Sequence, residues 1–240
     1  VDGREYEKKQ PLPKITVGTT WINKFKHCGQ TPLSHSDDVV RGFGNAMRRR
    51  GHRWVFDSTN TSARPADYID PAFGGRDDNV TKGIDSVDFG YFSTHGATRT
   101  NVDATGKIRT YFFDVSFDFP KDCDWFSTSA RFGNKQLKWL VMDACESMPL
   151  KKHVNTKVLP DPDPAKVWRR SFDGLHIIFG FAQNASDSWW TDYRGLTFGQ
   201  RAGCGKKLVD SWVDAAYSYW ADDYPVAMAA GRTVQDAETR

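Results

Sequence analysis

The sequence predicts a single α/β domain, a three-layer sandwich built on a mainly parallel six-stranded sheet. Two observations predict this class. Short apolar runs alternate along the chain with helical patterns, and several of these runs stop abruptly in polar residues. The 240 residues, 39% of them hydrophobic and 14% aromatic, are enough for one large core. We expect an N-terminal arm over 1–13, the domain over 14–231 and a polar tail over 232–240.

Six apolar runs are the predicted strands. They are too short for globular helices and rich in strand-compatible residues, as buried parallel strands are. In chain order the runs cover residues 15–22, 53–56, 87–92, 137–142, 175–182 and 224–230.

Helices are predicted between these strands. The segment from Ser36 to Gly51 begins with a good N-cap residue and places Val39, Val40, Phe43 and Met47 on one face. Residues 206–220 show the clearest helical spacing of apolar residues. Shorter helices are expected at 121–126 and around 167–168, whereas 57–79 reads as a long surface loop because Pro, Gly and Asp are frequent there.

The segment between Gly96 and Leu137 is longer than a crossover between parallel strands requires, which predicts an inserted hairpin. Residues 108–119 alternate apolar and polar side chains, as a strand with one buried face does. The polar positions Asp114, Ser116 and Asp118 are interpreted as a solvated face. A calcium site is the less favoured alternative, since a flat strand does not wrap around a cation.

Composition and charge exclude several functional classes. A net charge of +3 is too mild for a nucleic-acid partner, and no apolar run reaches the length of a membrane span. The four cysteines form no Cys-x-x-Cys pair, which argues against structural zinc, so neither a metal nor a cofactor is expected. Apart from Cys145, the cysteines Cys28, Cys123 and Cys204 fit one disulfide plus a free thiol or three buried thiols equally well.

Localisation is only weakly indicated. Three Asn-x-Ser/Thr patterns, starting at Asn60, Asn79 and Asn184, favour a secreted protein slightly, although three matches are close to chance in a chain of this size. The start at Val1 rather than Met is compatible with processing from a longer precursor. The oligomeric state cannot be read from the sequence.

Two of the predicted strands deliver reactive side chains at their carboxyl ends. The run 87–92 is followed by His95, and the run 137–142 is followed by Cys145. In open α/β sheets, ligands bind at the carboxyl ends of the strands. If the two strands are parallel neighbours, imidazole and thiol meet there, and the pair suits nucleophilic acyl transfer. We expect the imidazole to lower the pKa of the Cys145 thiol.

These two segments resemble the caspase-like superfamily of cysteine peptidases, which includes caspases, legumains, gingipains and clostripain. The matching motifs are Tyr-Phe-Ser-Thr-His-Gly at 91–96 and Val-Met-Asp-Ala-Cys at 141–145, with His95 and Cys145 50 residues apart. Asp-Ala-Cys-Glu-Ser at 143–147 is most similar to the legumain version. It departs from the caspase version, so aspartate specificity is not carried over.

The resemblance implies a peptidase that uses a Cys145–His95 dyad and an acyl-enzyme intermediate, with a peptide or protein as substrate. The backbone N–H groups of Gly96 and Cys145 would form the oxyanion hole, and a side chain at Gly96 would crowd the substrate. The specificity pocket would follow the next strand, where Asp187 could pair with a basic side chain. Ser186 and Trp189 could line the pocket wall, and Glu146 is a further candidate substrate-binding residue.

Two other functional classes remain open at this point. A non-catalytic caspase-like module would bind peptide or protein partners without cleaving them. A peptide ligase or an amidase would use the same dyad. A ligase differs from a hydrolase only in whether an amine or water attacks the acyl-enzyme.

Overall fold

The computed structural model describes residues 13–154, 159, 161–217 and 223–239, and the predicted N-terminal arm lies almost entirely outside this range. All six predicted strands are present in one sheet, in the order β2-β1-β3-β7-β8-β9. Their bounds are β1 Thr16–Trp21, β2 Arg53–Thr59, β3 Phe89–Ser93, β7 Trp139–Asp143, β8 Ile177–Phe181 and β9 Pro225–Ala229. Every neighbouring pair is parallel except β8 and β9, which confirms the mainly parallel α/β sheet.

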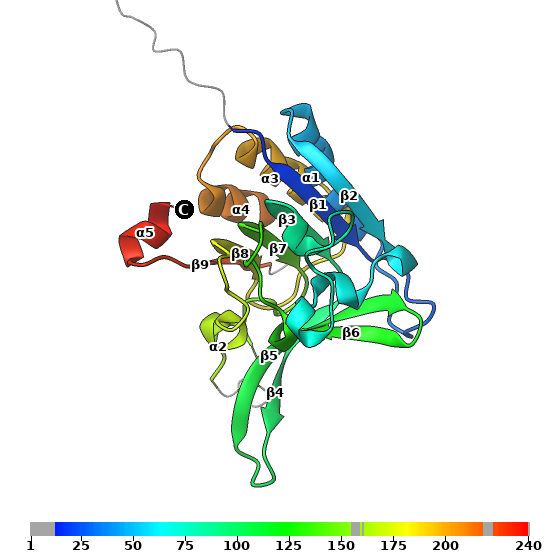
Figure 1. Cartoon of the computed structure of the whole chain (residues 1–240), viewed down its shortest axis with the longest axis vertical. Coiled ribbons are helices and arrows are strands. Elements are labelled where there is room, and N and C mark those ends of the chain that lie inside the picture. The colour runs from blue at the N-terminus through cyan, green and yellow to red at the C-terminus, as the bar shows by residue number, and fades with distance from the viewer. Residues whose placement is uncertain (1–12, 155–158, 160, 218–222, 240) are drawn as a thin grey trace, which may run out of the picture.

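Three helices cover one face of this sheet, namely α1 Ser36–Arg49, α3 Tyr193–Ala202 and α4 Leu208–Ala216 (Figure 1). Phe43, Phe198 and Trp212 bring one buried side chain from each helix into a common aromatic core with Tyr91 and Phe179 of the sheet. The 206–220 prediction is correct over α4, and its last three residues lie outside the described range.

The start of α1 differs in detail from the prediction. His35 is the N-cap, and the hydroxyl of Ser36 donates instead to the carbonyl oxygen of Ile22 at the end of β1. The Ser36 side chain therefore links the helix to the end of β1 and does not cap the helix.

A second sheet of three strands covers part of the opposite face. It consists of β4 Gly96–Val102, β5 Ile108–Phe119 and β6 Asp122–Phe126, and its β4–β5 arm projects from the body of the molecule (Figure 1). The predicted insertion is thus confirmed, but the helix expected at 121–126 is wrong. Lys121 has a φ of +69°, and the chain turns there so that β6 pairs antiparallel with β5.

The remaining short elements surround this second layer. Helix α2 Pro164–Trp168 packs on β5 and confirms the helix expected there. The long loop after β2 contains one-turn 3₁₀ helices, as do two later segments: η1 Asn60–Ser62, η2 Pro65–Tyr68, η3 Pro71–Phe73, η4 Ile84–Ser86, η5 Ser127–Ser129 and η6 Trp189–Thr191. Within the predicted polar C-terminal tail, residues Val234–Thr239 form the short helix α5.

The polar side of β5 is also less exposed than predicted. Ser116 and Asp118 are buried, and Asp118 accepts a hydrogen bond from the backbone N–H of His27 at 2.7 Å. At Asp118 this face therefore contacts the loop after β1 instead of solvent.

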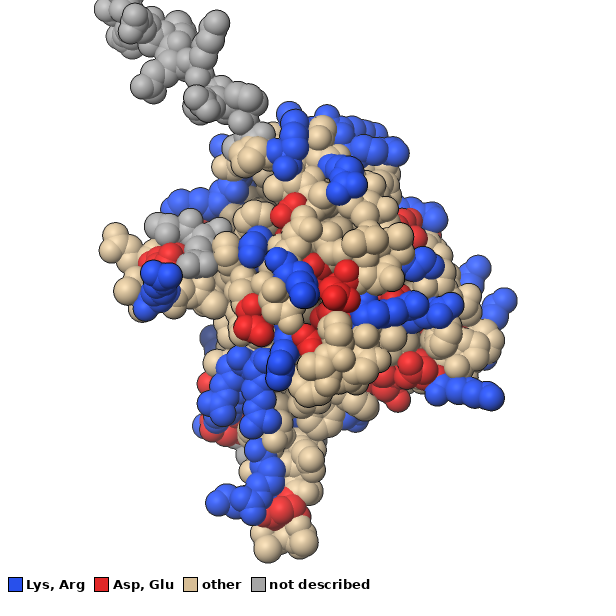
Figure 2. All heavy atoms as spheres, viewed as in Figure 1, with Lys and Arg blue, Asp and Glu red and all other residues tan. Residues whose placement is uncertain are grey.

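The surface of the described chain shows mixed charge on the face seen in Figure 2, where basic side chains line the β4–β5 arm and acidic ones gather near the centre. Among the described residues, no helix combines the length and apolar character needed to cross a bilayer.

Candidate active site

The sheet brings His95 and Cys145 to the same edge. Strands β3 and β7 are parallel neighbours in register, with Phe92 opposite Met142 and Ser93 opposite Asp143, so the residues that follow them emerge together. Both side chains line one small cavity of about 90 Å³. The predicted juxtaposition of thiol and imidazole therefore holds. No hydrogen bond joins the two groups in the described part of the chain.

The His95 ring is held by a backbone carbonyl. Its Nε2 lies 2.7 Å from the carbonyl oxygen of Thr31, and its ring lies 5.0 Å from that of Phe25. A carbonyl oxygen only accepts hydrogen bonds, so this contact assigns the proton to Nε2 in the neutral ring and leaves Nδ1 as the basic nitrogen. Nδ1 is the atom that could take a proton from a thiol.

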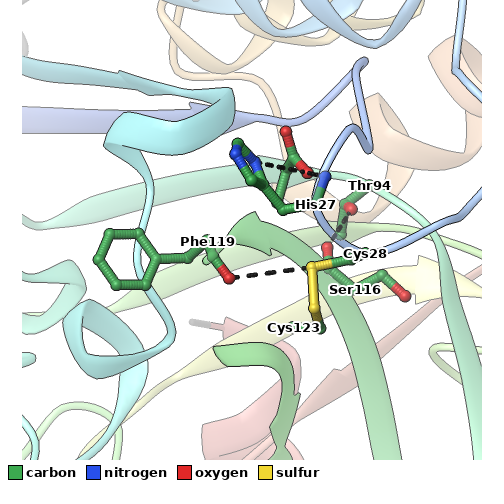
Figure 3. The surroundings of a disulfide bond; sticks show 7 residues. His27, Cys28, Thr94, Ser116, Phe119 and Cys123 are labelled. Carbon is green, nitrogen blue, oxygen red and sulfur yellow. Dashed lines mark hydrogen bonds and ion pairs between the residues drawn. A yellow bond between two sulfur atoms is a disulfide. The ribbon is translucent and has the colours of Figure 1, made fainter. Parts of the chain in front are cut away.

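A disulfide fixes the loop that carries Thr31. Cys28 is bonded to Cys123 of β6, which resolves the open question of cysteine pairing and leaves Cys145 and Cys204 free. Figure 3 shows the bridge beside Thr94 and Ser116, where the Thr94 hydroxyl donates to the Ser116 carbonyl oxygen at 2.6 Å. Ser116 N–H in turn donates to the carbonyl oxygen of His95 at 3.0 Å. The second sheet thus supports the backbone of His95, and the disulfide links this sheet to the loop that binds the His95 ring.

Cys145 lies half-buried in the turn after β7. Its Sγ accepts a hydrogen bond from the N–H of Ala185 at 3.4 Å. Burial raises the pKa of the Cys145 thiol above its ordinary value, and the nearby carboxylates of Asp143 and Glu146 act in the same direction. The expected lowering of this pKa is therefore wrong for the free protein.

This raised pKa predicts how Cys145 responds to pH. The rate of alkylation by iodoacetamide should rise about tenfold per pH unit from pH 6 to 8, because the thiolate fraction grows in that proportion below the pKa. Mass spectrometry of the Cys145 peptide measures the rate, and Cys145→Ala gives the background from Cys204. A rate that is already constant from about pH 6 would show instead a preformed thiolate–imidazolium pair.

A buried ion-pair network contributes Asp143 and Arg194 to the lining of the cavity. The guanidinium of Arg194 donates to both carboxylate oxygens of Asp143, at 3.0 and 2.8 Å, and to Asp223 at 3.3 Å. The Tyr91 hydroxyl donates to Asp143 at 2.7 Å. Burial raises the pKa of Asp143, whereas Arg194 and Tyr91 oppose that rise. The network connects β3, β7, α3 and the segment before β9. Sequence reasoning missed it, because no local pattern marks Arg194 or Asp223.

Two of the predicted substrate-binding residues line the cavity but already have partners. The backbone N–H and hydroxyl of Ser186 both donate to Asp223, at 2.9 and 2.8 Å. Asp187 accepts hydrogen bonds from the backbone N–H groups of Ser34 and His35, the latter at 2.7 Å. Asp187 thereby ties the loop after β8 to the segment that precedes α1.

The other predicted site residues lie outside the lining of this cavity. Trp189 is exposed and borders a separate groove of about 660 Å³ with Trp190 and Tyr193. Glu146 has a left-handed backbone with φ +52°, and its carbonyl oxygen accepts the Thr98 hydroxyl at 2.6 Å, so it is anchored to β4. Neither residue contacts the space between Cys145 and His95.

Gly96 is required for packing as well as for any role in binding. A Cβ at this position would lie 2.6 Å from the ring of Phe113 and 3.0 Å from the Cβ of Ala144. A side chain at position 96 would therefore collide with the protein itself, whether or not a substrate is bound. The N–H of Cys145 donates to no group within the described residues, which leaves it free for a ligand.

One cluster with metal-ligand chemistry borders the cavity. His35, Asp38 and Asp192 each offer a ligand atom, and these atoms lie within 4.8 Å of one another. His35 Nδ1 is 2.6 Å from a carboxylate oxygen of Asp192. Asp38 is exposed and the side chains of His35 and Asp192 are about one-quarter exposed, and an exposed acidic cluster does not by itself establish an ion, so we assign it none.

The fold and the site together define a mixed α/β protein with a cysteine and a histidine at the carboxyl edge of its parallel strands. Over residues 19–240 the chain matches the family described as "Domain of unknown function (DUF6345)", and it belongs to that family. A comparison with curated proteins gave no match.

Proposed function

We propose that this protein is a cysteine-dependent peptidase of caspase-like type that uses Cys145 as nucleophile and His95 as general base and acid. The observation that carries the proposal is the position of the two side chains. They follow adjacent parallel strands, line one cavity, and His95 is oriented by the Thr31 carbonyl so that Nδ1 is free. Nucleophile, base and a group that orients the base are the parts that acyl transfer requires.

The reaction follows from these parts. Nδ1 of His95 takes the proton of Cys145 as Sγ attacks the carbonyl carbon of the scissile peptide bond. The N–H of Cys145, which donates to no other described residue, and that of Gly96 would stabilise the developing oxyanion. The imidazolium then protonates the leaving amine, and the acyl-enzyme forms. Water deprotonated by His95 hydrolyses the thioester and restores the free thiol.

The raised pKa of Cys145 bears on how this cycle starts. A neutral thiol at rest means that proton transfer must accompany attack, and substrate must bring Sγ and Nδ1 closer than they are in the free protein. Catalytic hydrogen bonds are often long in unliganded enzymes, so their absence at rest is compatible with this mechanism.

The raised pKa of Cys145 also favours a second candidate, a non-catalytic module that binds peptides at this edge of the sheet. In such a module Cys145 would act as a small buried side chain and would react no faster than Cys204. A peptide ligase or an amidase would retain the dyad and differ in its products.

The decisive experiment is cleavage of a peptide library by the wild type, by Cys145→Ala and by the matched control Cys204→Ala. We expect the wild type and Cys204→Ala to cleave equally and Cys145→Ala to lose all measurable cleavage, because only Cys145 lines the cavity with His95. Product mass spectrometry separates hydrolysis from ligation. Equal cleavage by Cys145→Ala, or no cleavage by any of the three proteins, would contradict the proposal.

A further inference from the structure

Asp77 is a fully buried carboxylate without a partner. Its exposed fraction is 0%, and neither of its carboxylate oxygens accepts a hydrogen bond from any described residue. Asp85, buried to the same degree, accepts four hydrogen bonds from the backbone N–H groups of residues 133, 135, 136 and 137. A buried carboxylate is costly unless it is paired, hydrogen-bonded or bound to a metal. Asp77 has neither an ion-pair partner nor a hydrogen-bond donor among the described residues.

The backbone holds the acidic residues together. Asp77 N–H donates to the carbonyl oxygen of Ile69 at 3.1 Å, and Asp85 N–H donates to that of Asp77 at 2.7 Å. Asp70 is buried as well, and among the described residues its carboxylate accepts hydrogen bonds from Ala72 N–H and the side-chain amide of Asn134. A carboxylate has about four lone-pair positions, which the four hydrogen bonds of Asp85 fill, whereas the described residues leave positions open on Asp70 and Asp77.

We propose that the segment from Asp70 to Asp85 binds one calcium ion through the carboxylates of Asp77 and Asp70, with backbone carbonyl oxygens or water completing the shell. The ligand chemistry selects a hard cation, because the segment offers oxygen atoms and contains neither His nor Cys. Calcium suits irregular loop geometry better than magnesium, which demands a near-ideal octahedron. The disulfide between Cys28 and Cys123 indicates an oxidising compartment, where calcium-binding modules of modest affinity occur.

The position of this site gives the ion a structural role. Asp85 lies four residues before β3, and Asp70 and Asp85 both bind the segment 133–137, which leads into β7. The ion would therefore stabilise the entry to the two strands that carry His95 and Cys145, at the sheet edge opposite the candidate active site. This proposal does not depend on the proposed function.

Thermal unfolding of the full chain tests the site. Protein freed of metal with EDTA is measured with and without calcium chloride at about 100-fold excess over the dissociation constant. We expect the wild-type Tm to rise by about 5 to 10 °C with calcium. Asp77→Asn keeps the size of the side chain and removes its charge, so calcium should leave its Tm unchanged.

Asp38→Asn is the matched control, because Asp38 belongs to the other cluster of potential metal ligands and should keep the full calcium response. Equilibrium dialysis of the wild type against calcium should give one ion per chain, and this measurement decides the question if Asp77→Asn does not fold. No rise in the wild type, an equal rise in Asp77→Asn, or a rise lost only in Asp38→Asn would overturn the proposal.

Discussion

Replacement of Arg194 by Met should lower the free energy of unfolding by about 3 to 5 kcal/mol, the usual cost of removing one partner from a buried ion pair. Arg194 is 5% exposed, and its guanidinium binds Asp143 and Asp223, which are themselves buried. Met fills much of the same volume but leaves two carboxylates in the interior without a compensating charge. Urea unfolding at pH 7 measures the loss.

The loss should depend on pH in a predictable direction. Without Arg194, the pKa values of Asp143 and Asp223 in the folded protein rise further above their unfolded values, because burial then acts unopposed. The variant binds more protons when folded, so its deficit is largest at neutral pH and shrinks as the pH falls from 7 towards 4.

Arg201→Met is the matched control for this substitution. Arg201 forms an ion pair with Asp214, but both side chains are about half exposed. Exposed pairs contribute at most about 1 kcal/mol, so this variant should be close to the wild type. Similar losses in the two variants would mean that the buried network carries no special energy.

Strands β1, β3, β7 and β8 could be predicted because their side chains are almost all buried, on both faces of the sheet. Strands β2 and β9, at the two edges of the sheet, are only partly buried. In β7 and β8, for example, Val141 and Phe179 enter the helix-covered core while Met142 and Ile178 enter the core on the other face. A strand that is buried on both faces requires a continuous apolar run, and such a run can be recognised in the local sequence. The position of the Cys145–His95 pair followed from the same pattern, since it required only that β3 and β7 be neighbours.

Helix α3 could not be predicted because its sequence satisfies tertiary rather than local requirements. Gly195 and Gly199 are poor helix formers, but a Cβ at Gly195 would lie 1.9 Å from the carbonyl oxygen of Val39 and one at Gly199 would lie 2.9 Å from the Cβ of Ala46. The glycines permit close contact between α3 and α1. Strand β6 was mistaken for a helix for a similar reason, since its pairing with β5 and its disulfide to Cys28 come from distant residues.

The groups that orient the candidate catalytic residues could not be predicted from local sequence patterns either. The Thr31 carbonyl is a backbone atom 64 residues from His95, and any residue type could supply it. Arg194 is 51 residues from Asp143. The sequence therefore indicates which side chains could react, whereas their orientation is set by loop contacts that only the folded chain reveals.

Removal of the disulfide should affect stability and catalysis together. Cys28 and Cys123 are 95 residues apart, and in the chain-entropy model a loop of about this length contributes about 4 to 5 kcal/mol. The double variant Cys28→Ala/Cys123→Ala should lose most of this free energy in guanidinium chloride unfolding. Cys204→Ala, which removes a free exposed thiol, should not change it.

The effect on catalysis rests on the proposed peptidase activity and on the position of the bridge. Cys28 is three residues before Thr31, so loss of the bridge frees the loop that orients His95, although the contacts of His27 with Asp118 still restrain it. We expect kcat to fall about tenfold or more while KM changes little, because the imidazole spends less time in its productive orientation. Treatment of the wild type with a thiol reductant should reproduce this fall, and the same treatment should leave the double variant unchanged. A variant of reduced stability but normal kcat would show that the bridge supports the fold without positioning His95.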